Sequence, residues 1–99
     1  MSKLFTIGGV VDKNGGVEKG VGFKASRNGE GRYSIFFNPA FEEIYGFSGT
    51  QWYPADDGKT TDNLIVTGIN EVSVQVKTGD GSGDAADRSF TFVAYGKMK

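Results

Sequence analysis

The chain has 99 residues, of which 37% are hydrophobic and 13% aromatic, and its formal net charge is −1. This length fits one domain with one hydrophobic core, and the apolar content argues against disorder in spite of the 16 glycines. The near-neutral charge, with no basic block, gives no indication of a nucleic-acid partner or an anionic membrane surface.

The first predicted element is a strand over residues 3–11. Its apolar residues are interrupted by Gly8 and Gly9 and end at Asp12, so the run is too short for a signal peptide. No apolar run in the chain is long enough to span a bilayer. We therefore expect cytoplasmic synthesis, which is compatible with incorporation into a virus particle or release to the cell exterior.

Alternation of apolar and polar residues recurs along the chain, whereas no stretch keeps a helical period over three turns. We predict an all-β fold, a single antiparallel β-sandwich of about seven strands that covers residues 1–99. Residues 1–19 supply an N-terminal strand and a Gly-rich connection, and residues 20–96 form the core of the module. The predicted strands span roughly 3–11, 20–27, 31–38, 44–53, 63–69, 71–78 and 87–96.

Two dipeptides mark predicted turns. Asn14-Gly15 and Asn28-Gly29 both accept the positive φ that a type I′ hairpin turn requires at its central positions. The second pair is predicted to join the second and third strands and to fix their register. The glycines of the segment 15–20 are predicted to form a flexible connection between the first and second strands.

The faces of the predicted strands follow from the two-residue period of extended backbone. One face of each strand is expected to fill the space between the two sheets of the sandwich. The predicted core rows are Tyr33, Ile35 and Phe37; Leu64 and Val66; Val72, Val74 and Val76; and Phe90, Phe92 and Ala94.

Several apolar residues lie on the opposite faces of these strands. Five of them on adjacent strands would exceed the few hundred Å² of apolar patch that is typical of a monomer. A contact between copies related by cyclic symmetry would bury them, so we predict a homo-oligomer. Scattered exposure and burial under an eighth segment are the alternatives. The predicted interface residues are Phe36, Ile65, Ile69, Val93 and Tyr95.

From Gly20 onward, glycine and aromatic residues follow a recurring order. A Gly-Phe strand precedes an Arg-x-Gly-x-Gly-x-Tyr-x-Ile-x-Phe hairpin and a Phe turn, and a Phe-x-Phe-x-Ala-x-Gly segment closes the chain. The matching residues are Gly22, Phe23, Arg27, Gly29, Gly31, Tyr33, Ile35, Phe37, Pro39, Phe41, Asp87, Phe90, Phe92, Ala94 and Gly96. This pattern resembles a small module of phage tail fibres and bacterial surface proteins. It is similar to H-type lectin domains and, more loosely, to C1q-like jelly rolls.

The resemblance implies a compact antiparallel sandwich, of jelly-roll or H-type-lectin-like class, that assembles as a trimer or a multiple of it and often binds glycans. The chain departs from the module's pattern at Tyr45, where the module usually has a proline. We therefore expect a non-enzymatic, oligomeric structural or binding module of tail-fibre or surface-adhesin type. The alternative is a stand-alone carbohydrate-binding lectin of H-type character.

The segment after the fourth predicted strand carries the candidate ligand site. Trp52 and Tyr53 can present an aromatic face to the C–H side of a sugar ring, and Asp56, Asp57 and Asn63 can bind its hydroxyls. The alternative is structural: a strand-end aromatic pair that covers the core, followed by a solvated turn.

Other polar groups give no catalytic or metal site. The chain has no cysteine and no histidine, which removes thiol chemistry, the commonest general base and the commonest metal ligand. The acidic segment 80–87 lacks the closing glutamate of a calcium loop and is expected to be a soluble hairpin loop. Arg27 and Arg32 are expected to be solvated beside the turn at Asn28, with an interface ion pair as the alternative. No enzyme activity, cofactor or metal is predicted.

Overall fold

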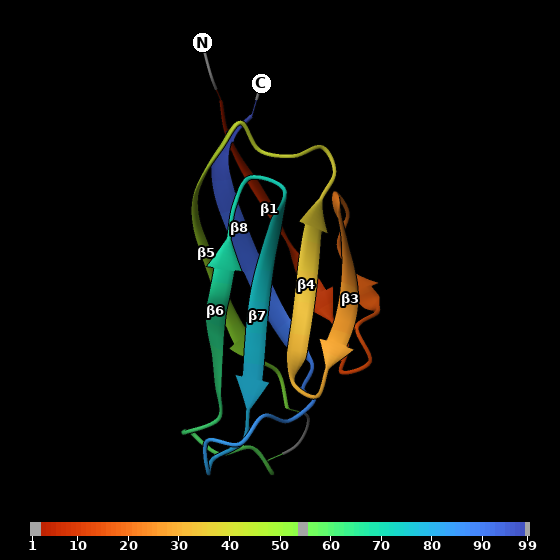
Figure 1. The fold of residues 1–99 in the computed structure, drawn as a ribbon, viewed down its shortest axis with the longest axis vertical. Helices are drawn as coiled ribbons and strands as arrows, with labels where there is room; N and C mark the ends of the chain where they lie inside the picture. Colours follow the sequence, from red (N-terminus) through yellow and green to blue (C-terminus); the bar gives the residue numbers. More distant parts are fainter. Residues whose placement is uncertain (1–2, 54–55, 99) are drawn as a thin grey trace.

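The computed structural model describes residues 3–53 and 56–98, which fold into eight β-strands and no helix (Figure 1). The all-β prediction is confirmed. Nothing in this described part of the chain is a helix long and apolar enough to cross a membrane. The strands are β1 (Lys3–Val11), β2 (Val17–Lys19), β3 (Phe23–Gly29), β4 (Arg32–Phe37), β5 (Glu43–Gln51), β6 (Asn63–Ile69), β7 (Ser73–Gly79) and β8 (Phe90–Met98).

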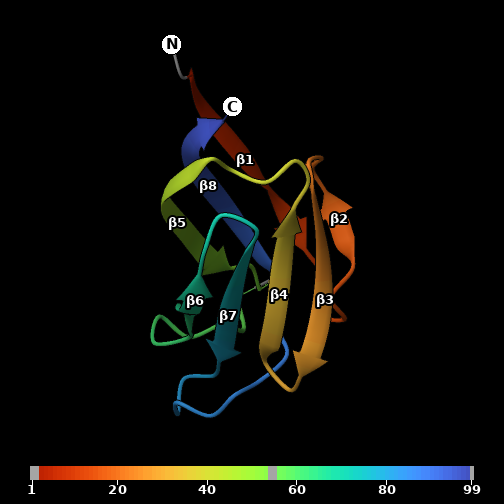
Figure 2. The same cartoon turned by 45° about the horizontal axis from the view of Figure 1, so that its top comes forward.

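The strands form two antiparallel four-stranded sheets that lie face to face as two layers (Figures 1 and 2). We call the sheet with the order β2-β1-β8-β5 sheet A, and the sheet with the order β3-β4-β7-β6 sheet B. β1 pairs with β8 along its whole length, with Lys3 opposite Met98, so both chain ends lie at one end of the molecule (Figure 1). We call the opposite end, where the segments 12–16, 56–62 and 80–89 meet, the loop end.

Aromatic side chains fill most of the space between the sheets. The ring of Phe92 lies between Phe23, edge-on with 4.8 Å between ring centroids, and Phe47, stacked with 5.1 Å between centroids. Tyr33 packs edge-on against Phe90, and both are fully buried. The predicted core rows of β4 and β8 are confirmed, because Tyr33, Ile35, Phe37, Phe90, Phe92 and Ala94 are all buried.

The segment predicted as a flexible connection contains the short strand β2. Lys19 pairs with Val10 and Val17 with Val11, on the outer edge of β1. All three residues of β2 are exposed, so the sequence has no alternation there that would reveal a strand. The prediction of seven strands is therefore one strand short, and the predicted second strand begins later, at Phe23.

The β3–β4 hairpin turns at Glu30-Gly31 and not at the predicted Asn28-Gly29. Gly29 still pairs with Arg32, and Gly31 takes the positive φ, +66°. Asn28 lies in a bulge of β3. The bulge shifts the pairing by one residue, from Arg27 opposite Tyr33 to Gly29 opposite Arg32, and this pairing leaves a two-residue turn at Glu30-Gly31.

Two register details differ from the simple two-residue period. A bulge in the middle of β6 places Ile69 opposite Val74, whose side chain is fully buried, so Ile69 points to the inner side of sheet B. It does not share the face of Ile65, as the period predicted. Val72 precedes β7 and is 56% exposed, so it is not part of the core row.

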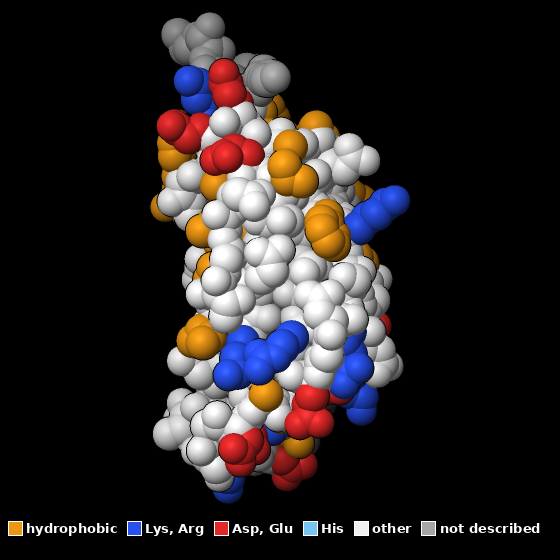
Figure 3. All heavy atoms as spheres, viewed as in Figure 1, with side chains coloured by type: hydrophobic (Ala, Val, Ile, Leu, Met, Phe, Trp, Pro, Cys, Tyr) orange, Lys and Arg blue, Asp and Glu red, His pale blue; other side chains and the backbone are white. Residues whose placement is uncertain are grey.

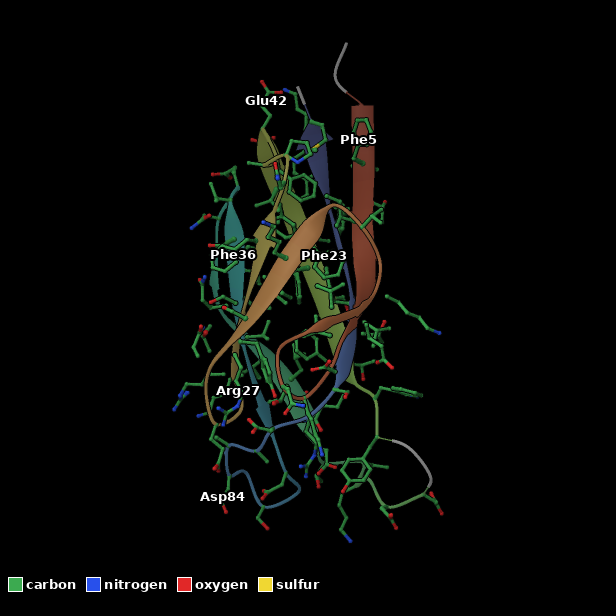
Figure 4. The ribbon with its side chains drawn as sticks, turned by 90° about the vertical axis from the view of Figure 1, so that its right-hand side faces the viewer. Phe5, Phe23, Arg27, Phe36, Glu42 and Asp84 are labelled. Carbon is green, nitrogen blue, oxygen red and sulfur yellow. The ribbon has the colours of Figure 1, made fainter. Side chains whose placement is uncertain are left out.

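The five predicted interface residues do not form one surface. Phe36 and Ile65 lie on the outer face of sheet B, Val93 and Tyr95 lie on the outer face of sheet A, and Ile69 lies on the inner side of β6. All five are 40–49% exposed. The outer face of sheet B is mostly polar, with isolated hydrophobic side chains (Figure 3), and Phe36 points away from the core that Phe23 enters (Figure 4). The prediction of a single second apolar surface is therefore wrong.

Adjacent residues on β4 provide a matched test of the face assignment. Phe37 is 4% exposed and packs edge-on against Phe41 at 5.0 Å, whereas Phe36 is 42% exposed. We expect Phe37→Ala to lower the free energy of unfolding by ~3–5 kcal/mol, because it removes a buried aromatic ring and leaves a cavity. Phe36→Ala should cost less than about 1 kcal/mol. Urea unfolding followed by circular dichroism measures both, and equal losses would contradict the face assignment.

Candidate functional site

The carboxylate of Asp87, in the segment between β7 and β8, joins several elements at the loop end. Arg27 Nε donates to both carboxylate oxygens at 3.0 Å, and the backbone N–H of Gly31 donates to Oδ1 at 2.8 Å. The hydroxyl oxygen of Tyr33 lies 3.5 Å from the same oxygen. The carboxylate thus connects β3, the β3–β4 turn and β4 to the segment that leads into β8.

Tyr33 extends this network to the segment 12–16 between β1 and β2, which we call the first loop. Its hydroxyl donates to the carbonyl oxygen of Lys13 at 2.7 Å and accepts a hydrogen bond from the backbone N–H of Arg88 at 3.2 Å. The first loop contains the predicted turn at Asn14-Gly15, with a φ of +91° at Gly15. One buried hydroxyl therefore holds two segments that lie far apart in the sequence.

The network shifts two pKa values. The hydrogen bond from Arg27, followed by the one from the N–H of Gly31, holds the pKa of Asp87 below its ordinary value. Burial raises the pKa of Tyr33, and the negative charge of Asp87 raises it further. The side chains of Arg27 and Asp87 are 38% and 31% exposed, so water screens the pair and its hydrogen-bond geometry matters more than its charge. Arg27 and Arg32 are both exposed, as predicted, and the ion pair that Arg27 forms with Asp87 lies within the chain.

Trp52 and Tyr53 form an exposed ridge at the end of β5. Their side chains are 53% and 40% exposed. The backbone N–H of Trp52 donates to the carbonyl oxygen of Ser89 at 2.9 Å. The guanidinium carbon of Arg88 lies 4.9 Å from the centre of the Tyr53 ring, a cation–π distance. The ridge is therefore anchored by the two residues that directly follow Asp87.

Depressions lie on both sides of this ridge. The first, of about 560 Å³, separates Trp52 and Tyr53 from the first loop and β2. The second, of about 490 Å³, lies between the ridge and the segment 56–62. Both volumes are in the range that small-molecule sites occupy. The polar residues of the first are Asp12, Lys13, Asn14, Glu18, Asp87, Arg88 and Ser89, and those of the second include Gln51, Asp56, Lys59 and Asp62.

The structure brings together part of the predicted ligand site. Asp56 lines the second depression with the ridge, and Asp57 lines a third depression, of about 300 Å³, beside Tyr53. Asn63 is the first residue of β6, and its Oδ1 accepts the backbone N–H of Leu64 at 2.9 Å. Asn63 does not line the depressions that the ridge borders.

Sequence reasoning missed the polar residues on the far side of the ridge. Asp12, Asn14 and Glu18 belong to the first loop and β2, far from Trp52 in the sequence, so no local motif links them to it. Arg88 directly follows Asp87, which belongs to the recurring glycine and aromatic pattern. This position in the sequence was the one signal that could have indicated a role for Arg88.

Buried polar atoms without a partner gather around the ridge. Among the residues that the structure describes, three buried side-chain atoms have no hydrogen-bond partner: Gln51 Oε1, Asp62 Oδ1 and Arg88 Nε. Each belongs to a residue that lines one of the three depressions. Such an atom costs free energy unless water or a ligand supplies its hydrogen bond, so the concentration of these atoms here is consistent with a binding role for the loop end.

The acidic loop 80–84 is closed by its own hydrogen bonds. Asp80 Oδ1 accepts the backbone N–H groups of Ser82 and Asp84 at 2.9 Å and 3.0 Å. The N–H of Asp80 in turn donates to the carbonyl oxygen of Asp84 at 2.9 Å. Within residues 3–53 and 56–98, no group of three or more acidic, histidine or cysteine side chains is placed to hold a metal ion.

Comparison with protein-family profiles, with characterised proteins and with solved structures gave no match. The resemblance to tail-fibre modules and H-type lectins therefore rests on the sequence pattern alone, and function has to be argued from the geometry of the loop end.

The lowered pKa of Asp87 predicts how acid affects stability. A carboxyl group whose pKa is lowered on folding stabilises the fold above its ordinary pKa, and this contribution is lost as the pH falls through the lowered value. We expect Asp87→Asn to be less stable than the parent at neutral pH, with the difference shrinking as the pH falls below about 4. Urea midpoints measured at successive pH values test this.

The matched control for this measurement is Asp84→Asn, because Asp84 is an exposed carboxylate in the neighbouring loop. We expect it to leave the urea midpoint almost unchanged at neutral pH. A loss of stability on Asp87→Asn that is as large at pH 2 as at pH 7 would show that the charge of Asp87 is not its cause.

Proposed function

We propose that this chain is a non-enzymatic binding module of tail-fibre or surface-adhesin type, which assembles with copies of itself and binds a carbohydrate at the loop end. The observation that carries the proposal is the exposed ridge of Trp52 and Tyr53 between two polar depressions. A sugar ring offers an apolar C–H face to an aromatic side chain while its hydroxyls bind carboxylates and amides. Asp12 and Glu18 supply acceptors on one side of the ridge, and Asp56 supplies one on the other.

The orientation of the ridge supports this proposal. Both chain ends lie at the end of the molecule opposite the loops (Figure 1); Figure 4 likewise places Arg27 and Asp84 at the loop end and Phe5 and Glu42 at the other. A ligand on the ridge would thus lie far from both termini. A surface-exposed location, on a virus particle or at the cell exterior, fits such an arrangement.

A jelly-roll or H-type-lectin-like class is part of the proposal. It is supported by the two antiparallel four-stranded sheets with the recognition loops gathered at one end. The alternative is a stand-alone lectin of H-type character, which would bind sugar through the same ridge without a structural role in a larger assembly.

Trp52 is the only tryptophan of the chain, so its fluorescence reports on the ridge alone. We expect the protein to bind members of a broad glycan array, and we expect the bound glycans to change this fluorescence on titration. Trp52→Ala should weaken binding at least about tenfold, because truncating an aromatic anchor commonly costs ~2 kcal/mol or more.

Tyr45→Ala is the matched control, because Tyr45 is an aromatic of similar exposure, 52%, near the other end of β5. It should leave glycan binding unchanged. An array without any bound glycan would overturn carbohydrate recognition and favour a purely structural role. Equal losses on Trp52→Ala and Tyr45→Ala would move the site away from the ridge.

A further inference from the structure

One long side of the sandwich, between the edge strands β5 and β6, is open except at the loop end, where Gln51 Nε2 donates to the carbonyl oxygens of Asn63 and Gly79. In the described part of the chain, β5 pairs only with β8 and β6 pairs only with β7. Each edge therefore presents backbone N–H and C=O groups that have no strand partner. Unpaired groups of this kind are a template for pairing with another strand.

The core is incompletely covered on this side. Val66 and Ile69 lie opposite the buried Val76 and Val74, so their side chains face inward, yet they are 39% and 47% exposed. Phe47, on the inner side of β5, is also only partly buried. Hydrophobic side chains gather along this margin of the molecule, at the left of the space-filling view (Figure 3).

The opposite long side, between β2 and β3, is closed by the chain itself. A Cβ on Gly20 would lie 2.6 Å from the carbonyl oxygen of Gly8, so the segment that leads from β2 to β3 packs directly on β1. The backbone N–H of Asn38 donates to the carbonyl oxygen of Gly22 at 3.0 Å. This side also carries the charged residues Lys19 and Lys24. The open side is thus a specific feature and not a general property of this fold.

The charged residues of β5 and β6 limit which partner can cover the open side. No charged residue occurs from Ile44 to Gln51 on β5 or from Asn63 to Ile69 on β6. Edge strands of monomers commonly carry lysine or proline that prevents pairing, and neither residue occurs in these two stretches. In an antiparallel two-fold contact the residues near the axis meet their own copies, so a charge in the middle of either strand would lie close to the same charge. The one charged residue of the two strands, Glu43, is the first residue of β5, so the uncharged remainder of both strands suits such a contact.

The direction of the strands is compatible with one symmetry axis. β5 runs toward the loop end and β6 runs away from it (Figure 1). A two-fold axis perpendicular to the sheets sets each strand antiparallel to its own copy, so both edges can pair at once. We propose that a second copy of this chain covers the open side, with β5 against β5 and β6 against β6, and that both sheets continue across the contact.

This inference rests on the assembly role in the proposed function, but it is independent of ligand binding at the loop end. The trimer that the sequence resemblance implied would not pair both edges in this way. Loss of glycan binding on Trp52→Ala tests ligand binding at the loop end, and the solution mass tests the contact between copies.

The experiment is light scattering of the whole chain over a concentration series, with Ser48→Lys on β5 as the test variant. Ser48 is exposed on the outer side of β5, so the substitution adds charge to the edge without entering the core. We expect the parent to reach twice the chain mass, and we expect Ser48→Lys to raise the dissociation constant about tenfold or more. Thr91→Lys is the matched control, because Thr91 is an exposed hydroxyl residue on the same face of β8, one strand inward.

Amide hydrogen exchange locates the contact if the variant lowers stability. The backbone N–H groups of β5 and β6 should gain protection as the concentration of the parent rises, and those of β3 should not. A parent that stays monomeric at millimolar concentration would overturn the proposal and leave a strand of another protein as the occupant. A mass of three chains, or equal effects of Ser48→Lys and Thr91→Lys, would also overturn it.

Discussion

The hydrogen bonds of the Asp87 carboxylate are the constraint on which the loop end depends. The sheets alone fix the strands, but the segment between β7 and β8 has no ladder partner apart from one bridge between Gly79 and Ala85. Arg27 and Gly31 hold this segment against the β3–β4 hairpin through one side chain. Because a charged acceptor binds N–H groups more strongly than a neutral one, a single carboxylate can do this in a partly exposed position.

The placement of the residues that hold the ridge follows from that anchor. Arg88 and Ser89 come directly after Asp87, and they hold the Tyr53 ring and the backbone of Trp52. The ridge is therefore positioned by a segment whose own place is set by β3 and β4. The Arg, Gly and Tyr of the hairpin pattern that resembles tail-fibre modules make contacts to Asp87, so the pattern has a structural reason independent of any ligand.

The sequence correctly predicted the strands and faces that depend on local periodicity. It did not predict the features that depend on pairing between distant segments. The rows on β4 and β8 and the bounds of β1 and β6 follow from the two-residue period, because strict alternation leaves one buried face. β2 has no such period, and its place depends on β1. The bulges in β3 and β6 moved a turn and reversed the face of Ile69, since one inserted residue shifts every later side chain to the other face. The site was only partly predictable, because Asp12 and Glu18 reach Trp52 through the fold.

The surplus of apolar residues has a different meaning in the structure than in the sequence. From the sequence we assigned five apolar residues to the second faces of the strands. The two sheets divide four of them between opposite outer faces, where single exposed apolar side chains are ordinary, and Ile69 lies on an inner face. The residues at the open side are different, because they belong to the inner faces and extend the core to the surface beside two unpaired edges. Covering the open side would lower the free energy in two ways, because it would bury apolar area and would pair the free peptide groups of the edge strands. An outer face offers only the first, which is why we propose the edges and not the faces as the place for a second copy.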